Sequence, residues 1–102
     1  MEQLQFEFRD GTLKSGQPAA LVGVVGSGNL EVLMENATLN GGCQVTVNTA
    51  ARGFEQIWKA VLDDFFARHP LADVRVSIND MGATPAVVSL RLDQAVEEFI
   101  GG

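Results

Sequence analysis

The strongest constraint on this sequence is a change in the spacing of its apolar residues at Gly53. Before this residue, apolar and polar side chains alternate with a period of two, which is the pattern of strands with one solvated face. After it, apolar residues recur at intervals of three and four, the spacing of an amphipathic helix. A chain of 102 residues with such a change of period predicts a domain of the α+β class.

Four strand segments are expected before Gly53. Residues 20–25 are apolar at every position, which is typical of a central strand covered on both faces. Residues 26–29 are expected to form the four-residue turn of a hairpin, and residues 40–42 to close a second hairpin. The apolar positions of the three alternating segments are Leu4, Phe6, Phe8, Leu30, Val32, Met34, Cys43, Val45 and Val47.

Two helices with a strand between them are expected after Gly53. The first helix should end at His69 and Pro70, and Thr84 and Pro85 form a cap and first-turn pair that predicts the start of the second. The apolar residues that should face the core are Phe54, Ile57, Trp58, Val61, Leu62 and Phe65 in the first helix, Val74, Val76 and Ile78 in the strand, and Val88, Leu92, Ala95, Val96 and Phe99 in the second helix.

The predicted order of elements is therefore β-β-β-β-α-β-α in one domain that spans residues 1–102. Its simplest packing is a two-layer sandwich, in which both helices cover one face of a largely antiparallel five-stranded sheet. Residues 43–80 form a strand-helix-strand unit that predicts one parallel, right-handed crossover.

The composition narrows the classes of partner. The formal net charge of −6 disfavours nucleic acid and anionic membrane surfaces, and it favours docking onto basic patches of larger proteins. Cys43 is the only cysteine and His69 the only histidine, so neither a disulfide nor a metal site is expected. The N-terminal residues lack the pattern of a signal peptide, and the longest apolar run, residues 19–26, is too short to span a bilayer. These observations predict a cytoplasmic protein.

Ser27 stands between Gly26 and Gly28, which predicts an exposed hydroxyl that another enzyme can reach. Gly and Ser are also common in turns, so a purely structural role has to be weighed against this one. The loop is not a nucleophile elbow, because Val25 and Asn29 occupy the positions where that motif has glycines. It is not a dinucleotide fingerprint either, because a strand follows it instead of a helix.

Other polar residues favour structural roles. His69 comes at the end of the first helix, where a cationic group interacts well with the helix dipole. The acidic pairs at 63–64 and 97–98 lie on faces that should be solvated. Residues 82–85 begin the second helix and present free N–H groups that would suit a phosphate if the fold brought them near Ser27.

Four stretches of the chain resemble the malonate decarboxylase delta subunit. They are residues 22–33 (VGVVGSGNLEVL), 65–70 (FFARHP), 78–85 (INDMGATP) and 90–94 (LRLDQ). The resemblance covers most of the chain and is weakest before Ala19. It implies an acyl carrier subunit with no catalytic residue of its own, in which Ser27 binds phosphoribosyl-dephospho-coenzyme A through a phosphodiester.

The same resemblance implies the partners of this carrier. A prosthetic-group transferase would attach the group, an acetyl-CoA-transferase-like alpha subunit would exchange its acetyl for malonyl, and the beta and gamma subunits would release carbon dioxide. Asn29 departs from the pattern, since some relatives have Asp there. If an acidic residue at this position assists the transferase, attachment to Ser27 would be slower in this chain.

Three alternatives remain open at the level of sequence. The chain would be an interaction or small-ligand regulatory subunit if Ser27 stays unmodified, and a hydrolase if Ser27 and His69 form a catalytic pair. The terminal Gly101 and Gly102 are similar to the end of ubiquitin-like modifiers. They follow a predicted helix, however, which favours ordinary use of glycine beyond a helix end.

Overall fold

A computed structural model describes residues 1–101 of the chain, and Gly102 lies outside the described part. Five strands and two helices follow in the predicted order. Their bounds are β1 (Glu2–Phe8), β2 (Ala19–Gly23), β3 (Leu30–Asn36), β4 (Cys43–Thr49), α1 (Glu55–Arg68), β5 (Val74–Asp80) and α2 (Pro85–Gly101).

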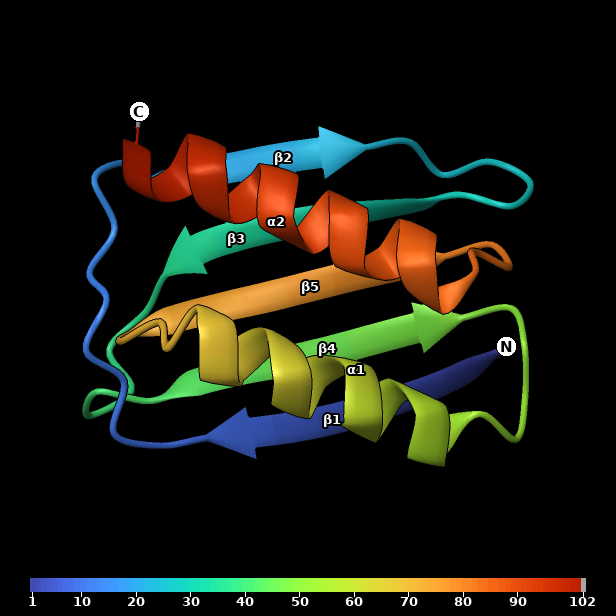
Figure 1. Cartoon of the computed structure of the whole chain (residues 1–102), viewed down its shortest axis with the longest axis horizontal. Helices are drawn as coiled ribbons and strands as arrows, with labels where there is room; N and C mark the ends of the chain where they lie inside the picture. The colour runs from blue at the N-terminus through green and yellow to red at the C-terminus, as the bar shows by residue number, and fades with distance from the viewer. Residues whose placement is uncertain (102) are drawn as a thin grey trace.

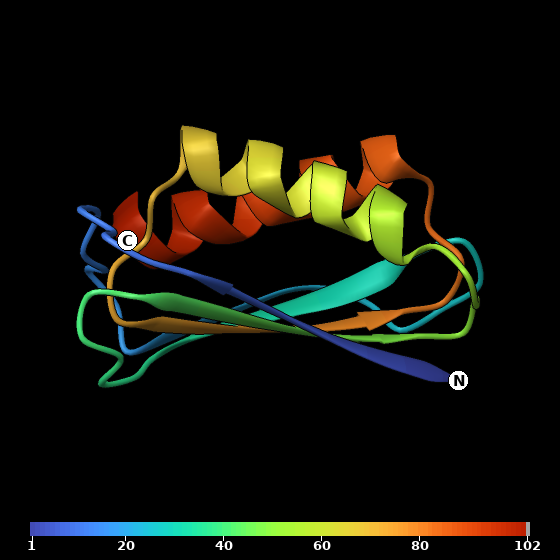
Figure 2. The ribbon, with the colours of Figure 1, turned by 90° about the horizontal axis from the view of Figure 1, so that it is seen from below.

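The strands form one mixed sheet in the order β1-β4-β5-β3-β2 (Figure 1). β4 and β5 are parallel, and the other three neighbouring pairs are antiparallel. Both helices cover the same face of the sheet, which leaves the opposite face open (Figure 2). The predicted α+β sandwich, with its largely antiparallel sheet and single parallel pair, is confirmed.

The prediction of a central strand over residues 20–25 was wrong. β2 ends at Gly23 and lies at the edge of the sheet, where it pairs only with β3. Leu21, on the open face, and Val24 and Val25, beyond the strand, are all more than half exposed. An unbroken apolar run therefore marks an exposed apolar edge here, and not a strand covered on both faces.

The second predicted hairpin was also wrong. Residues 40–42 do form a turn, with positive φ at Asn40 and Gly41. The strands that this turn joins are not neighbours, however, because β5 lies between β3 and β4 and hydrogen-bonds to both. The crossover through α1 places β5 parallel to β4, and this long-range pairing replaces the local hairpin.

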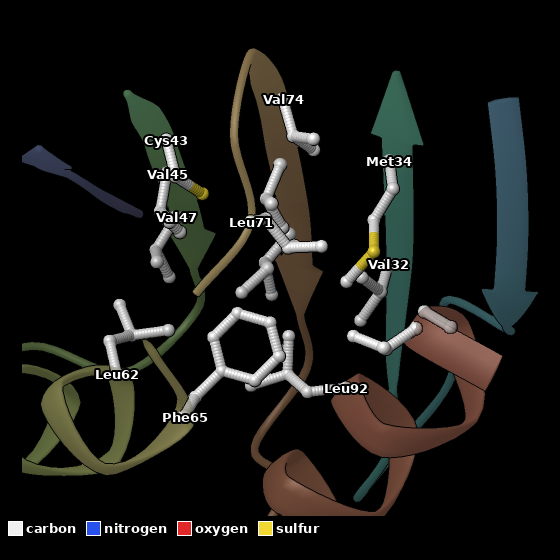
Figure 3. Close-up of a cluster of buried hydrophobic side chains, with 14 of the residues drawn as sticks. Val32, Met34, Cys43, Val45, Val47, Leu62, Phe65, Leu71, Val74 and Leu92 are labelled. Atoms are coloured by element: carbon white, nitrogen blue, oxygen red, sulfur yellow. The ribbon is translucent and has the colours of Figure 1, made fainter. Parts of the chain in front are cut away.

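The core lies between the sheet and the helices. Figure 3 shows Leu62 and Phe65 of α1 and Leu92 of α2 directed toward side chains of the central strands. All five predicted core positions of α2 are buried, as are Trp58, Leu62 and Phe65 of α1. Two of the core positions predicted for the first helix were wrong, since Phe54 and Ile57 are 45% and 46% exposed.

The predicted helix limits are confirmed. α1 ends at Arg68, and the His69 N–H donates to the carbonyl of Phe65 as the chain leaves the helix. Thr84 precedes the first residue of α2, and its hydroxyl accepts a hydrogen bond of 3.4 Å from the Val87 N–H. Within residues 1–101, no helix is both long and apolar enough to cross a membrane.

Candidate functional site

Ser27 lies in the six-residue loop 24–29 that joins the edge strand β2 to β3, so the expected four-residue turn is longer by two residues. Within this loop, the Asn29 N–H donates a hydrogen bond of 2.9 Å to the Gly26 carbonyl. Gly28 has φ of 72°, the left-handed backbone that a type II turn requires at its third position. Ser27 occupies the second position of this turn and is exposed.

The two glycines beside Ser27 leave its surroundings open. A Cβ atom added to Gly26 or Gly28 would find no other atom within 4 Å. Gly28 is required by its positive φ, but Gly26 has no positive φ and no close neighbour. Neither backbone geometry nor packing inside this chain therefore explains glycine at position 26. What it does provide is free access to the Ser27 hydroxyl.

The loop is anchored although its tip is exposed. The Gly28 N–H donates to the Met81 carbonyl at 2.8 Å, and the Met81 N–H donates to the Asn29 carbonyl at 3.0 Å. Met81 lies in the segment that leads from β5 into α2. The fold thus brings residues 82–85 beside the Ser27 loop. The sequence alone could not show that these two segments lie close together.

A side-chain contact fixes the other end of the loop. The Asn29 Oδ1 accepts hydrogen bonds from the Leu30 N–H at 2.8 Å and from the Arg91 Nε at 3.2 Å. Arg91 also donates to Gln94 Oε1 at 2.9 Å, so one face of α2 holds the guanidinium against the loop. Sequence analysis assigned no role to Arg91, since 62 residues separate it from Asn29.

Asp80 orders the segment between the loop and α2. This carboxylate is only 4% exposed, and it accepts hydrogen bonds from the Ala83 N–H and the Thr49 hydroxyl, both at 2.9 Å. A buried carboxylate with two donors restrains the turn at 81–84, because leaving either oxygen unpaired would cost free energy. Sequence analysis assigned no role to Asp80, although this residue ends a predicted strand and belongs to the stretch 78–85.

His69 lies at the opposite end of the molecule from Ser27. α1 begins at the sheet end that carries the Ser27 loop and ends at Arg68 (Figure 1). Its 14 residues span about 20 Å. Catalysis by a Ser27–His69 pair needs hydrogen-bond distance, so the geometry excludes the hydrolase alternative.

The contacts of His69 are structural. Its Nε2 lies 3.1 Å from Asp93 Oδ1 on α2, and the Arg68 guanidinium donates to the same oxygen at 2.6 Å. Hydrogen bonds to Asp93 and Asp64 raise the pKa of Arg68 above its ordinary value. This cluster joins the end of α1 to α2, as expected for cationic groups at a helix C-terminus. The acidic residues 63, 64, 97 and 98 are all exposed on the helix faces, as predicted.

These features define the class of protein. An exposed serine stands on an anchored turn, and the only histidine of the chain is far from it. The surface of the described residues carries open grooves and a small cavity of about 210 Å³. Such a domain displays an accessible serine hydroxyl on a fixed turn, an arrangement that is compatible with a carrier.

The comparisons with known proteins agree with that class. The model of the malonate decarboxylase delta subunit (MdcD) family matches residues 17–99. The chain is 61% identical over 104 residues to the malonate decarboxylase acyl carrier protein of Stenotrophomonas maltophilia (strain R551-3), covering 100% of this chain and 97% of that relative. Its identity to the protein of the same name from Burkholderia cepacia is 62% over 98 residues, covering 96% and 90%.

A solved structure shares the fold as well. One chain of a Pseudomonas malonate decarboxylase hetero-tetramer in complex with malonate superposes with a TM-score of 0.84 at 42% identity, covering 96% of this chain and 98% of that one. The present chain therefore belongs to the malonate decarboxylase delta subunit family. As a member of this family, it is an acyl carrier subunit of the malonate decarboxylase type.

Proposed function

We propose that this chain carries acetyl and malonyl thioesters on phosphoribosyl-dephospho-coenzyme A, attached to Ser27 through a phosphodiester. The observation that supports this most directly is the exposed Ser27 hydroxyl between two glycines, on a turn that two backbone hydrogen bonds hold against the entry to α2. A fixed, accessible hydroxyl suits a transferase that must bring a large nucleotide to it.

The residues around Ser27 fit such a group. The space at Gly26 and Gly28 is open, so the two residues beside Ser27 leave room for a phosphodiester on its oxygen. Arg91, held against Asn29, places a positive charge beside the loop. The group supplies the thiol on which acyl groups travel, while the protein supplies position and orientation.

The chain itself leaves the chemistry to its partners. In this proposal an acetyl-CoA-transferase-like alpha subunit exchanges acetyl for malonyl, and the beta and gamma subunits decarboxylate the malonyl thioester in the cytoplasm. The role of the carrier is to keep the thioester tethered, which raises its effective concentration at both partner sites. The net charge of −6 would assist docking onto basic surfaces around these sites.

Intact-protein mass spectrometry with peptide mapping tests the proposal, on chain purified from its native host during growth on malonate. The expected result is the added mass of phosphoribosyl-dephospho-coenzyme A, with or without an acyl group, on the peptide that contains Ser27. Ser27→Ala should abolish the addition, and the matched control Ser89→Ala on α2 should retain it. A bare mass would overturn the proposal in favour of an interaction subunit.

A further inference from the structure

A small cavity of about 210 Å³ lies between the N-terminal ends of α1 and α2. Phe54, Ile57 and Trp58 line it from the side of α1, and Ala83, Pro85 and Val88 line it from the side of α2. Both helices begin at the sheet end where the β2–β3 loop also lies (Figure 1). The cavity and Ser27 therefore share one end of the molecule.

Two walls of this cavity are apolar side chains that the fold leaves uncovered. Phe54 and Ile57 have the helical spacing of core residues, but they are 45% and 46% exposed, whereas Trp58 beside them is 6% exposed. Exposed apolar side chains around a concavity are typical of a binding site. The volume is below the roughly 300–1,000 Å³ of pockets for drug-sized ligands, which limits the occupant to about one ring system.

The polar groups of the cavity restrict the chemistry of the occupant. Asp80 and Thr49 also line it, and Asp80 is a buried carboxylate already paired with Thr49 and with the Ala83 N–H. Its negative charge disfavours a phosphate or the carboxylate of a malonyl group. It still has free lone pairs that accept N–H donors. Aromatic walls with such an acceptor favour a flat, uncharged ring that carries an amino group.

The backbone connects the cavity directly to the Ser27 loop. Met81 exchanges hydrogen bonds with Gly28 and Asn29, and the next residue, Gly82, lines the cavity. The thiol end of a coenzyme A arm must stay free to carry acyl groups, so the arm has to be anchored through its nucleotide end. The phosphoribosyl unit joins the serine to the nucleotide, so adenine is the aromatic ring nearest the attachment point.

We propose that this cavity binds the adenine ring of the prosthetic group on Ser27, with Phe54 and Trp58 as its aromatic walls. This inference rests on the proposed function, because it takes the arm to be attached at Ser27. Adenine bound here keeps the nucleotide on the carrier surface, and the pantetheine segment remains free to reach the partner sites.

Trp58 provides the readout, because it is the only tryptophan of the chain. We would compare Trp58 fluorescence, excited at its red edge, in carrier whose modification has been verified by mass and in unmodified Ser27→Ala carrier. Adenine in the cavity should quench the modified protein. Hydrolysis of the arm at its diphosphate releases 4′-phosphopantetheine and leaves adenosine monophosphate, joined through the phosphoribosyl unit, on Ser27. This cleavage should preserve the quenching.

Equal fluorescence of the modified and unmodified proteins would overturn this inference and leave the proposed function intact. Recovery of the unmodified spectrum after diphosphate cleavage would also overturn it, since pantetheine would then be the occupant. A Ser27 peptide without added mass would overturn the proposed function itself, which is a different outcome from these two. In that case adenosine monophosphate, titrated into the unmodified chain, decides whether the cavity binds adenine, and absence of saturable quenching overturns the inference.

A pair of variants tests the wall of the cavity. Phe54→Ala should weaken binding of adenosine monophosphate about tenfold, because stacking of an aromatic side chain on a base changes affinity by roughly five- to 150-fold. Leu90→Ala is the matched control, since Leu90 is 51% exposed on α2 and does not line the cavity. Both variants remove exposed side chains and should melt like the parent. Equal affinity of the two variants would contradict the proposed wall.

Discussion

Cys43 shows how one buried residue affects the way this carrier can be assayed. It is the only cysteine of the chain and is 2% exposed at the start of β4, and burial raises its pKa to about 12. The thiolate is the form that reacts with disulfide reagents, and at pH 8 almost none of this thiol is ionised. The Cys43 thiol therefore does not react with disulfide reagents in the folded state.

The unreactive Cys43 thiol leads to a prediction for thiol labelling. Folded Ser27→Ala carrier should show no thiol that reacts with an aromatic disulfide at pH 8, and deacylated, modified carrier should show the single thiol of its arm. Unfolding in guanidinium should add one thiol to each count, from Cys43. Rapid labelling of the folded Ser27→Ala protein would show that Cys43 is accessible.

Two glycines three positions apart should respond in opposite ways to the same substitution. Gly23 has φ of 89°, and a Cβ atom there would collide with the Leu30 carbonyl. Gly23→Ala should therefore lower the free energy of unfolding by about 1–3 kcal/mol or more. Gly26 has open space and no positive φ, so Gly26→Ala should leave stability unchanged or raise it by up to about 1 kcal/mol.

Urea denaturation of the two variants measures both effects. Gly26→Ala should nevertheless slow the modification of Ser27, because its methyl group would stand beside the hydroxyl that the transferase approaches. A destabilised Gly26→Ala protein would show instead that glycine is needed there by the fold.

At the scale of elements, α1 depends on a few large side chains. Trp58 is 6% exposed, while Leu62 and Phe65 are fully buried against the sheet (Figure 3). Trp58→Ala should lower the free energy of unfolding by about 3–5 kcal/mol, because it removes a large buried side chain and leaves a cavity. Circular dichroism has to follow this transition, since the variant has no tryptophan. The exposed neighbour Gln56→Ala is the control and should stay within about 0.5 kcal/mol of the parent.

At the scale of the whole molecule, Asp73 ties together segments that are far apart in sequence. Its Oδ1 accepts hydrogen bonds from the Leu39 and Gly41 N–H groups, each at 3.0 Å, and its Oδ2 pairs with Lys14 at 3.0 Å. The hydrogen bonds from Gly41 and Leu39, followed by that from Lys14, lower the pKa of Asp73 to about 2. The folded state therefore favours the ionised carboxylate.

The sign of the pH dependence follows from this lowered pKa. Stability from Asp73 is fully present above the ordinary pKa of 3.8 and is lost as the pH falls from there to about 2. Asp73→Asn should be less stable than the parent at pH 7, and the difference should shrink below pH 4. Urea denaturation at a series of pH values checks this, with the exposed Glu98→Gln as the control. A difference that stays constant down to pH 2 would exclude the ionised carboxylate as its cause.

The sequence by itself determined what depends on local spacing. The core positions of α2, the alternation of β4 and β5 and the end of α1 before Pro70 all follow from the contrast between apolar and polar residues within one segment. The exposed turn at Ser27 follows in the same way, because glycines on both sides leave a serine without cover. Local periodicity reports which face of an element is buried.

Only the tertiary structure decided which elements meet. Periodicity does not record strand order, so it did not reveal that β5 separates β3 from β4 or that β2 is an edge strand. Neither the contact of Arg91 with Asn29 nor the cavity beside Trp58 has a local signature. Phe54 and Ile57 are the instructive case, since their spacing is that of core residues. They stay exposed because the start of α2 does not reach over them, and that separation is set by long-range packing alone.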